Sequence, residues 1–277
     1  MVQSQTFPLW VSHTSMRDFL TCPRAYFLRN IYKDPITRKK INIINPALAL
    51  GNTVHDVLDE ISSLPVEDRF KKPLLDRYEE AWKRVTGELG GFKDAMEEMV
   101  YKARGIVMLQ QVIDNPGPLL QKAVKLHSPD TLPPRYMISV EDNILLCGKV
   151  DWLEYFPEDN SVHIIDFKTG VHDEKADSLQ LPIYALLVKN CQKRAIKKIS
   201  YWYLERSDKP AEKPLPDYEE SYARIMDIAL QMKRLRAERV FVCRQNGCFA
   251  CKPLEKIVKG QAKYIKTSGY QDIYVVD

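Results

Sequence analysis

Two aspartates and a lysine in the middle of the chain carry the strongest chemical signal. The segment 148–168 reads GKVDWLEYF, then PEDN, then SVHIIDFK. If PEDN is the loop of a hairpin, the register of the two strands places Asp151 opposite Asp166. Opposed carboxylates repel each other and destabilise a sheet, unless both bind one divalent cation such as Mg²⁺ or Mn²⁺. Lys168 stands two residues beyond Asp166 and therefore projects from the same strand face.

A structural ladder is the alternative for these residues. In the same register Lys149 faces Lys168, so two lysines could neutralise two aspartates on one solvated face. The neighbouring residues argue for burial, because they are apolar: Val150, Trp152, Ile164 and Ile165. Buried charges are costly unless they are paired or bind a metal. The residue types alone leave the metal site and the ladder equally open.

The elements that must position these residues follow from periodicity and capping signals. Ser12 or Ser15 can cap a helix through residues 16–32, in which Pro23 requires a kink or a new helix start. Apolar spacing predicts helices at 47–62, 66–86, 92–113, about 177–193 and about 217–238. Residue composition predicts strands at 136–141, 144–156, 161–169, 198–205 and 272–276. This order indicates an α/β fold with one mixed sheet flanked by helices.

The charges and the cysteines gather at the two ends of the sequence. The net charge is +4, but residues 1–46 hold seven Lys/Arg against two Asp, and residues 232–277 hold ten Lys/Arg against four Asp/Glu. Two basic ends around an acidic middle are typical either of solvated helices or of a surface that follows phosphates. Cys22 lies in the first basic segment, and three cysteines lie in the last: Cys243, Cys248 and Cys251. Four cysteines can hold Zn²⁺ or an iron–sulfur cluster, whereas Cys147 and Cys191 have apolar neighbours and are predicted core residues.

Several classes of protein are excluded by what the sequence lacks. No apolar run is long enough to span a membrane, and residues 1–15 do not have the pattern of a secretory leader. We therefore expect a cytoplasmic, intracellular protein. The chain has no phosphate-binding loop of the G-x4-G-K-[ST] type, which excludes a helicase motor.

Five short motifs in order resemble the RecB-like branch of the PD-(D/E)XK nucleases. Across residues 12–255, the matching stretches are Ser15–Tyr26 (S-x3-F-x2-CP-x2-Y), Gly51–His55 (G-x3-H), Gly148–Asp151 (GKVD), Asp166–Gly170 (DFKTG) and Gln180–Tyr184 (Q-x3-Y). The resemblance implies a restriction-endonuclease-like mixed sheet flanked by helices, with a helical insertion and a cysteine-bearing C-terminal tail. It also implies a single nuclease domain over 1–277. Its parts are helices at about 47–126, a sheet core at about 135–240, and termini 12–46 and 241–277 that form a cluster-binding, DNA-facing subregion.

The same resemblance assigns roles to individual residues. Asp151, Asp166 and Lys168 would be catalytic, with Lys168 orienting and polarising the attacking water. The metal ligands would be His55, Asp151, Asp166 and the backbone carbonyl of Phe167. Gln180 and Tyr184 lie one turn apart on a helix, and they would contact DNA or position Lys168; ordinary packing is the alternative. Val150 stands where the family name has proline.

The resemblance also bears on the cysteines. Some RecB-like nucleases, of the AddB and CRISPR-adaptation types, hold a [4Fe-4S] cluster with one N-terminal and three C-terminal cysteines. This similarity favours a [4Fe-4S] cluster on Cys22, Cys243, Cys248 and Cys251, with Zn²⁺ as the alternative. The spacing departs from the usual pattern, because Cys243 precedes the C-x2-C pair and no cysteine follows it.

The function implied is that of a Mg²⁺- or Mn²⁺-dependent DNA exonuclease or end-processing enzyme, acting on single-stranded DNA or DNA ends. A helicase, or a repair or CRISPR-adaptation complex, would be its partner. Two alternatives remain open: a catalytically inactive DNA-binding module that recruits partners within such a complex, and a zinc-binding interaction protein with a chance D-x-K.

Overall fold

The computed structural model describes residues 7–126, 130 and 132–276. The α-helices in this part of the chain are α1 (His13–Thr21), α2 (Pro23–Asn30), α3 (Pro46–Ser62), α4 (Leu74–Trp82), α5 (Ala95–Asp114), α6 (Gln180–Cys191), α7 (Tyr218–Glu238) and α8 (Lys252–Val258). The strands are β1 (Leu9–Val11), β2 (Lys40–Ile43), β3 (Arg135–Ser139), β4 (Ile144–Cys147), β5 (Trp152–Phe156), β6 (Ser161–Lys168), β7 (Ala195–Tyr203), β8 (Ala211–Lys213), β9 (Lys263–Ser268) and β10 (Gln271–Val275). None of the described helices is both long enough and apolar enough to cross a membrane.

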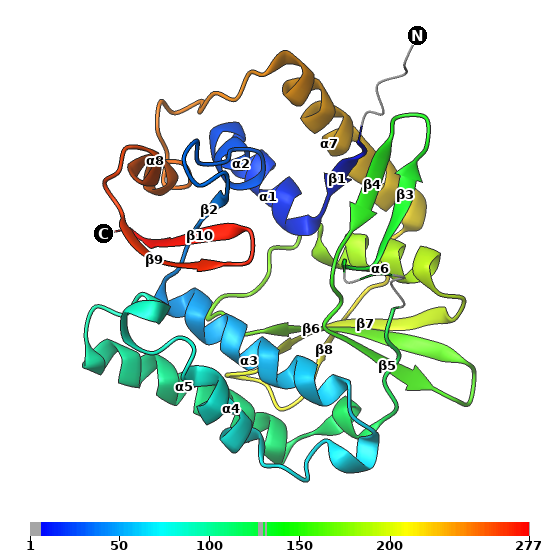
Figure 1. Cartoon of the computed structure of the whole chain (residues 1–277). Helices are drawn as coiled ribbons and strands as arrows, with labels where there is room; N and C mark the ends of the chain where they lie inside the picture. Colours follow the sequence, from blue (N-terminus) through cyan, green and yellow to red (C-terminus); the bar gives the residue numbers. More distant parts are fainter. Residues whose placement is uncertain (1–6, 127–129, 131, 277) are drawn as a thin grey trace.

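The central sheet has the strand order β5-β6-β7-β8 and is mixed. β6 runs antiparallel to β5 and parallel to β7, and β8 is an edge strand that pairs antiparallel with β7. Figure 1 shows α3, α4 and α5 on one side of this sheet, with α6 and α7 on the other. The predicted mixed α/β class, with a sheet flanked by helices, is confirmed.

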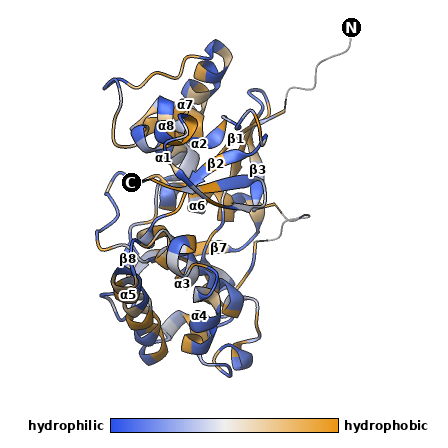
Figure 2. Ribbon diagram, turned by 60° about the vertical axis from the view of Figure 1, so that its left-hand side comes forward, coloured by the Kyte–Doolittle hydropathy of each residue, from blue (hydrophilic) through white to orange (hydrophobic). Residues whose placement is uncertain are grey.

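Both faces of β6 are buried, because helices cover the sheet on each side. Ile164 belongs to the core shared with α6 and α7. Its neighbour Ile165, together with Phe167, belongs to the core shared with α3, α4 and α5. Full burial of one such side chain contributes about 1.5–3 kcal/mol. Figure 2 shows the corresponding pattern on α3 and α4, whose hydrophobic residues alternate with hydrophilic ones around the helix.

The two ends of the chain meet in a third core. β2 pairs in parallel with β10, and α2 and α8 share a buried cluster that includes Cys22, Cys248 and Cys251. In Figure 1 the blue N-terminal helices lie beside the orange and red C-terminal elements. Residues far apart in the sequence are thereby brought together around the cysteines.

Three features differ from the predicted elements. The predicted strand 144–156 is interrupted at 148–151, and its halves enter different sheets: β4 joins β1 and β3, whereas β5 joins the central sheet. The strands therefore form three sheets in the described chain, not one. The predicted helix 66–86 is helical mainly at α4. The new helix start predicted at Pro23 is confirmed, because α1 ends at Thr21 and α2 begins at Pro23, as its missing N–H allows. Ser12 is the N-cap of α1, and its side chain accepts a hydrogen bond from the Ser15 N–H.

Candidate active site

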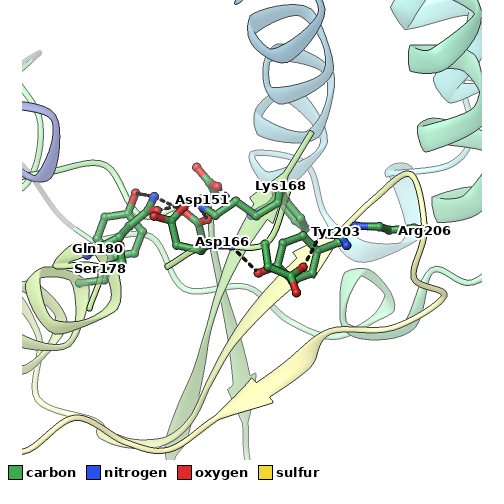
Figure 3. A network of polar contacts seen from close by, with 11 residues as sticks. Asp151, Asp166, Lys168, Ser178, Gln180, Tyr203 and Arg206 are labelled. Carbon is green, nitrogen blue, oxygen red and sulfur yellow. Dashed lines mark hydrogen bonds and ion pairs between the residues drawn. The ribbon is translucent and has the colours of Figure 1, made fainter. Parts of the chain in front are cut away.

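The β5–β6 hairpin has the register that its loop predicts. Phe156 pairs with Ser161, and Trp152 pairs with Ile165. Asp151 follows directly, outside the ladder, and its Oδ2 accepts a hydrogen bond of 2.9 Å from the backbone N–H of Phe167. The carboxylate of Asp151 is thus anchored beside the end of β6, next to Asp166 (Figure 3).

Asp166 is a buried carboxyl group with one oxygen only partly satisfied. Its side chain is 2 % exposed, and its Oδ1 accepts a hydrogen bond of 2.6 Å from Nε2 of Gln180. Oδ2 accepts no hydrogen bond of normal geometry from the described residues, although Nζ of Lys168 lies 3.0 Å away. Burial, reinforced by the charge of Asp151, raises the pKa of Asp166 to about 7.

Lys168 lies between carboxylates and stays protonated. Its Nζ is 3.0 Å from Oδ2 of Asp166 and 3.0 Å from Oε2 of Glu174, and it donates a hydrogen bond to Oε1 of Gln180. Burial lowers the pKa of Lys168, but the two carboxylates outweigh burial and the net direction is upward. Lys168 therefore acts as a positive charge and a hydrogen-bond donor, not as a base.

The structure does not contain the alternative Asp/Lys ladder. The ladder required Lys149 to face Lys168 and to neutralise the aspartates of the hairpin. Lys149 instead forms an ion pair of 2.9 Å with Asp59 of α3, and its side chain is largely exposed. The lysine that forms an ion pair with Asp166 is Lys168.

His55 approaches this group from α3. Its Nδ1 lies 3.6 Å from Oδ1 of Asp151, longer than a hydrogen bond. Burial lowers the pKa of His55, but the nearby carboxylates of Asp151 and Asp166 outweigh it and raise the pKa. Gly51, one turn earlier on α3, permits a close approach, because a Cβ there would lie 3.1 Å from Oγ1 of Thr169 at the end of β6.

Gln180 connects the charged groups through its amide. It accepts from Lys168 and donates to Asp166, while its Nε2 also donates to the hydroxyl of Tyr184 at 3.2 Å. Figure 3 shows this chain of contacts running from α6 to the end of β6. Through these hydrogen bonds Gln180 contacts Lys168 and Asp166, and Tyr184 contacts Gln180. Contacts with other site residues favour a positioning role for the two side chains over ordinary packing.

Glu174 is the site residue that sequence reasoning missed. It lies in the loop between β6 and α6, binds Lys168, and donates its backbone N–H to the Tyr203 hydroxyl at 3.0 Å. A single acidic residue in a polar loop carries no periodic or spacing signal, so nothing in the sequence distinguishes it.

The donor set fits a divalent cation. Asp166 offers a buried oxygen that lacks a hydrogen-bond partner of normal geometry, Asp151 offers Oδ1, and His55 offers an imidazole nitrogen nearby. Oxygen and imidazole donors of this kind suit Mg²⁺ or Mn²⁺. Among the described residues, the donor atoms of these three groups do not all lie within 4.8 Å of one another.

The four predicted cysteines do converge. Among the described residues, the one set of three or more metal-ligating atoms lying within 4.8 Å of one another is Cys22, Cys243, Cys248 and Cys251. Sγ of Cys248 and Sγ of Cys251 are 3.8 Å apart. Cys147 and Cys191 are half-buried and lie outside this set.

The local environment shifts the pKa values of three of these thiols in different directions. Hydrogen bonds from the backbone of Gly247 and then Gln245 lower the pKa of Cys243 to about 6. Burial raises the pKa of Cys251 to about 12 and also raises the pKa of Cys22. Backbone donors that favour the thiolate of Cys243, beside thiols whose pKa burial raises, are compatible with a metal-binding site.

Comparison with known families gives one match. A family described as the PD-(D/E)XK nuclease superfamily matches residues 10–253. This span includes every site residue described above, from His55 to Tyr184, and all four converging cysteines. No curated protein matches the sequence.

Proposed function

Because the chain belongs to the PD-(D/E)XK nuclease superfamily, we propose that it is a metal-dependent deoxyribonuclease of the RecB-like branch. It hydrolyses phosphodiesters in single-stranded DNA or at DNA ends, as an exonuclease or end-processing enzyme. The observation that carries this proposal is the constellation at the end of β6, where Asp151, Asp166 and Lys168 meet and Gln180 joins two of them.

His55, Asp151 and Asp166, with the carbonyl of Phe167, would hold the cation. A bound Mg²⁺ or Mn²⁺ supplies Lewis-acid stabilisation of the charge that builds on the phosphate and makes a water acidic. The Phe167 N–H fixes the Asp151 carboxylate, which keeps Oδ1 free for the cation. Gln180 fixes Asp166 through Oδ1, which leaves Oδ2 as its available donor.

Lys168 would orient the attacking water. Because it remains protonated, its ammonium donates a hydrogen bond to the water oxygen and stabilises negative charge that develops there. Gln180 and Glu174 hold the amine in place from opposite sides. Tyr184 supports the Gln180 amide. These contacts would hold the Lys168 side chain in one rotamer, so that its ammonium is already positioned at the reacting atoms.

The four cysteines would hold a [4Fe-4S] cluster that fastens the two ends of the chain together, as the resemblance to RecB-like nucleases favours. Zn²⁺ is the second candidate, and a specific observation favours it. A tetrahedral site with Zn–S bonds of about 2.3 Å separates its sulfurs by about 3.8 Å. This is the distance between Sγ of Cys248 and Sγ of Cys251. A [4Fe-4S] cube binds each thiolate through a different iron and spreads the sulfurs further.

Metal analysis of protein purified without oxygen decides between these two centres. Four iron atoms per chain and broad visible absorption are expected for the cluster. A colourless protein with one zinc per chain would replace the cluster with a tetrahedral zinc site.

DNA would lie across the surface made by the basic termini.

We propose that the described chain works as one nuclease domain, because both termini pack against each other and α1 packs on α7 beside the central sheet. A helicase, or a repair or CRISPR-adaptation complex, is the partner that would present single strands or ends to it.

Cleavage of end-labelled single-stranded and duplex DNA tests the catalytic assignment. We expect Mg²⁺- or Mn²⁺-dependent cleavage, and we expect Asp166→Asn to lower it at least about 10³-fold, because a metal ligand and its charge are lost. Asp159→Asn, in the loop of the same hairpin, is the matched control and should retain activity. Full activity in Asp166→Asn, or no cleavage by the unmodified protein with either metal, would refute the proposal.

A further inference from the structure

A cavity of 740 Å³ opens between α2 and the segment that follows α7. It lies away from the carboxylates of the active site, and its walls come from both ends of the chain. Phe27 of α2 and Ile31, directly after its end, line one side, and Val240, Phe241 and Val242 line the other. Figure 1 shows this second segment running from the end of α7 over α2 towards α8.

The floor of the cavity is aromatic. Phe27 and Phe241 stack with their ring centroids 4.9 Å apart and their planes 27° from parallel. Both side chains are half-buried, so solvent reaches part of each ring. Aromatic side chains that solvent reaches can stack with a nucleobase.

The rim of the cavity is cationic. Arg24, Arg236 and Arg239 line it, and no carboxylate is found among its described lining residues. Arg24 lies over the Phe27 ring at 5.6 Å and binds Glu255 at 3.2 Å. Arg236 donates to the Tyr26 hydroxyl at 2.8 Å. Arg239 is exposed at the end of α7, where no described acidic side chain pairs with it.

Two further positive charges, those of Lys33 and Lys40, interact with Arg236 or with each other in this region. Burial lowers the pKa of Lys40, and the positive charges of Arg236 and Lys33 lower it further. Like charges held this close together are unfavourable unless an anion binds among them. Phosphate groups are the anions that arginines and lysines bind in this arrangement.

We propose that this cavity, the Phe27/Phe241 pocket, is a nucleobase-stacking subsite for single-stranded DNA. One unpaired base stacks on the Phe27/Phe241 rings while Arg236 and Arg239 pair with the flanking phosphates. A base in the interior of a duplex does not fit this role, because it is stacked on both sides and exposes no face to a protein ring. This inference rests on the proposed nuclease function and names single-stranded DNA as the substrate class.

Binding is measured with a single-stranded oligonucleotide that carries one 2-aminopurine, whose fluorescence is quenched by stacking. Every protein carries Asp166→Asn, so that no cleavage interferes. We expect Phe241→Leu, which keeps an apolar side chain but removes the ring, to weaken binding about tenfold and to abolish part of the quenching. Tyr270→Leu removes an exposed ring from the β9–β10 turn and is the matched control, expected to bind as the parent does.

A second variant keeps the test valid if Phe241→Leu unfolds the segment. Arg239→Gln changes an exposed side chain, and we expect it to reduce the slope of log affinity against log salt by about 0.7, the value for one phosphate contact with a single strand. Unchanged affinity, quenching and salt slope in both variants would overturn the proposal, as would equal weakening of blunt duplex binding by Phe241→Leu.

The same proteins without Asp166→Asn separate the two proposals. If the unmodified chain cleaves DNA while Phe241→Leu and Arg239→Gln bind normally, only the stacking subsite is refuted. If both variants weaken single-strand binding but the unmodified chain cleaves no DNA with Mg²⁺ or Mn²⁺, the nuclease function is refuted and the subsite stands.

Discussion

The charges around Lys168 do not balance among the described side chains. Asp151, Asp166 and Glu174 bring three carboxyl groups to one region, against the ammonium of Lys168 and the imidazole of His55. Burial and the Asp151 charge raise the pKa of Asp166, which shows that its ionised form is disfavoured there. A divalent cation bound at the proposed site would supply the missing positive charge. The imbalance that makes Asp166 hard to ionise therefore makes this region a favourable cation site.

Glu174→Gln tests how Lys168 is held in the active form. Burial lowers the pKa of Lys168 and its carboxylate partners raise it above its usual value, so removal of one carboxylate lowers the pKa. The alkaline fall in activity, where the ammonium loses its proton, should move to lower pH. We also expect kcat near neutral pH to fall about tenfold, because the amine loses one of its anchors. A pH–rate profile of DNA cleavage measures both effects.

Asp173→Asn is the control for this prediction. Asp173 is the adjacent residue in the same loop, but it pairs with Arg206 and not with Lys168. The variant should leave the alkaline limb of the profile unchanged. A Glu174→Gln profile that coincides with the unmodified one would show that Glu174 has no part in holding Lys168.

At the scale of elements, the packing of α3 against the end of β6 places His55. A Cβ added at Gly51 would lie 3.1 Å from Oγ1 of Thr169, so Gly51→Ala pushes α3 and β6 apart by a few tenths of an ångström. Alanine is a better helix former by about 1 kcal/mol, and Tm should not fall. We expect instead a roughly tenfold higher Mn²⁺ concentration for half-maximal cleavage, because His55 moves away from Asp151.

The double variant distinguishes this contact from a general effect on the helix. Thr169→Ala removes the Oγ1 atom that the new methyl group meets. Combined with Gly51→Ala, it should restore the Mn²⁺ requirement to near that of the parent. A single Gly51→Ala variant with normal Mn²⁺ dependence would show that α3 does not position His55 through this contact.

The hairpin of the central sheet is predictable because its information is local. A four-residue loop fixes which residues pair, and the alternation along β6 then places Lys168 and Asp166 on one face and Phe167 on the other. The cysteine centre is predictable for a different reason: thiols at the two ends of a chain with few other cysteines have few alternative partners.

The division of the strands into three sheets is not local and could not be predicted. Residues 144–147 and 152–156 are both mostly apolar and both form strands, and the stretch 148–151 between them does not indicate that the two halves join different sheets. The break depends on β1, which pairs with β4 from the far N-terminal end. It also depends on Gly148, where a Cβ would lie 2.9 Å from Leu187 of α6. Glu174 could not be predicted for the same reason. Its contact with Lys168 forms only when the loop between β6 and α6 is folded.

At the scale of the whole molecule, the two termini form one unit. The parallel pairing of β2 with β10 and the buried contact of α2 with α8 join the first and last parts of the described chain. The four cysteines lie within this unit, where three are buried and Cys243 is half-buried. The same unit also forms both walls of the Phe27/Phe241 pocket. A metal centre here therefore stabilises the proposed DNA-binding surface without touching the carboxylates of the active site.

Cys22→Ser tests this arrangement, with Cys147→Ser as the matched control outside the cluster. Cys22 is the N-terminal member of the four converging cysteines, so its loss would disconnect the N-terminal helices from a metal held by the three C-terminal cysteines. Binding of a structural metal contributes directly to folding free energy, and we expect Tm to fall by roughly 10 °C, together with the loss of bound iron or zinc. Limited proteolysis should then cut the segment between α7 and α8, whose attachment to α2 depends on the centre. Cys147→Ser should keep the metal and the parent Tm. Retention of stoichiometric metal in Cys22→Ser would mean that the N-terminal cysteine is not a ligand and that the pairing of β2 with β10 alone joins the two ends.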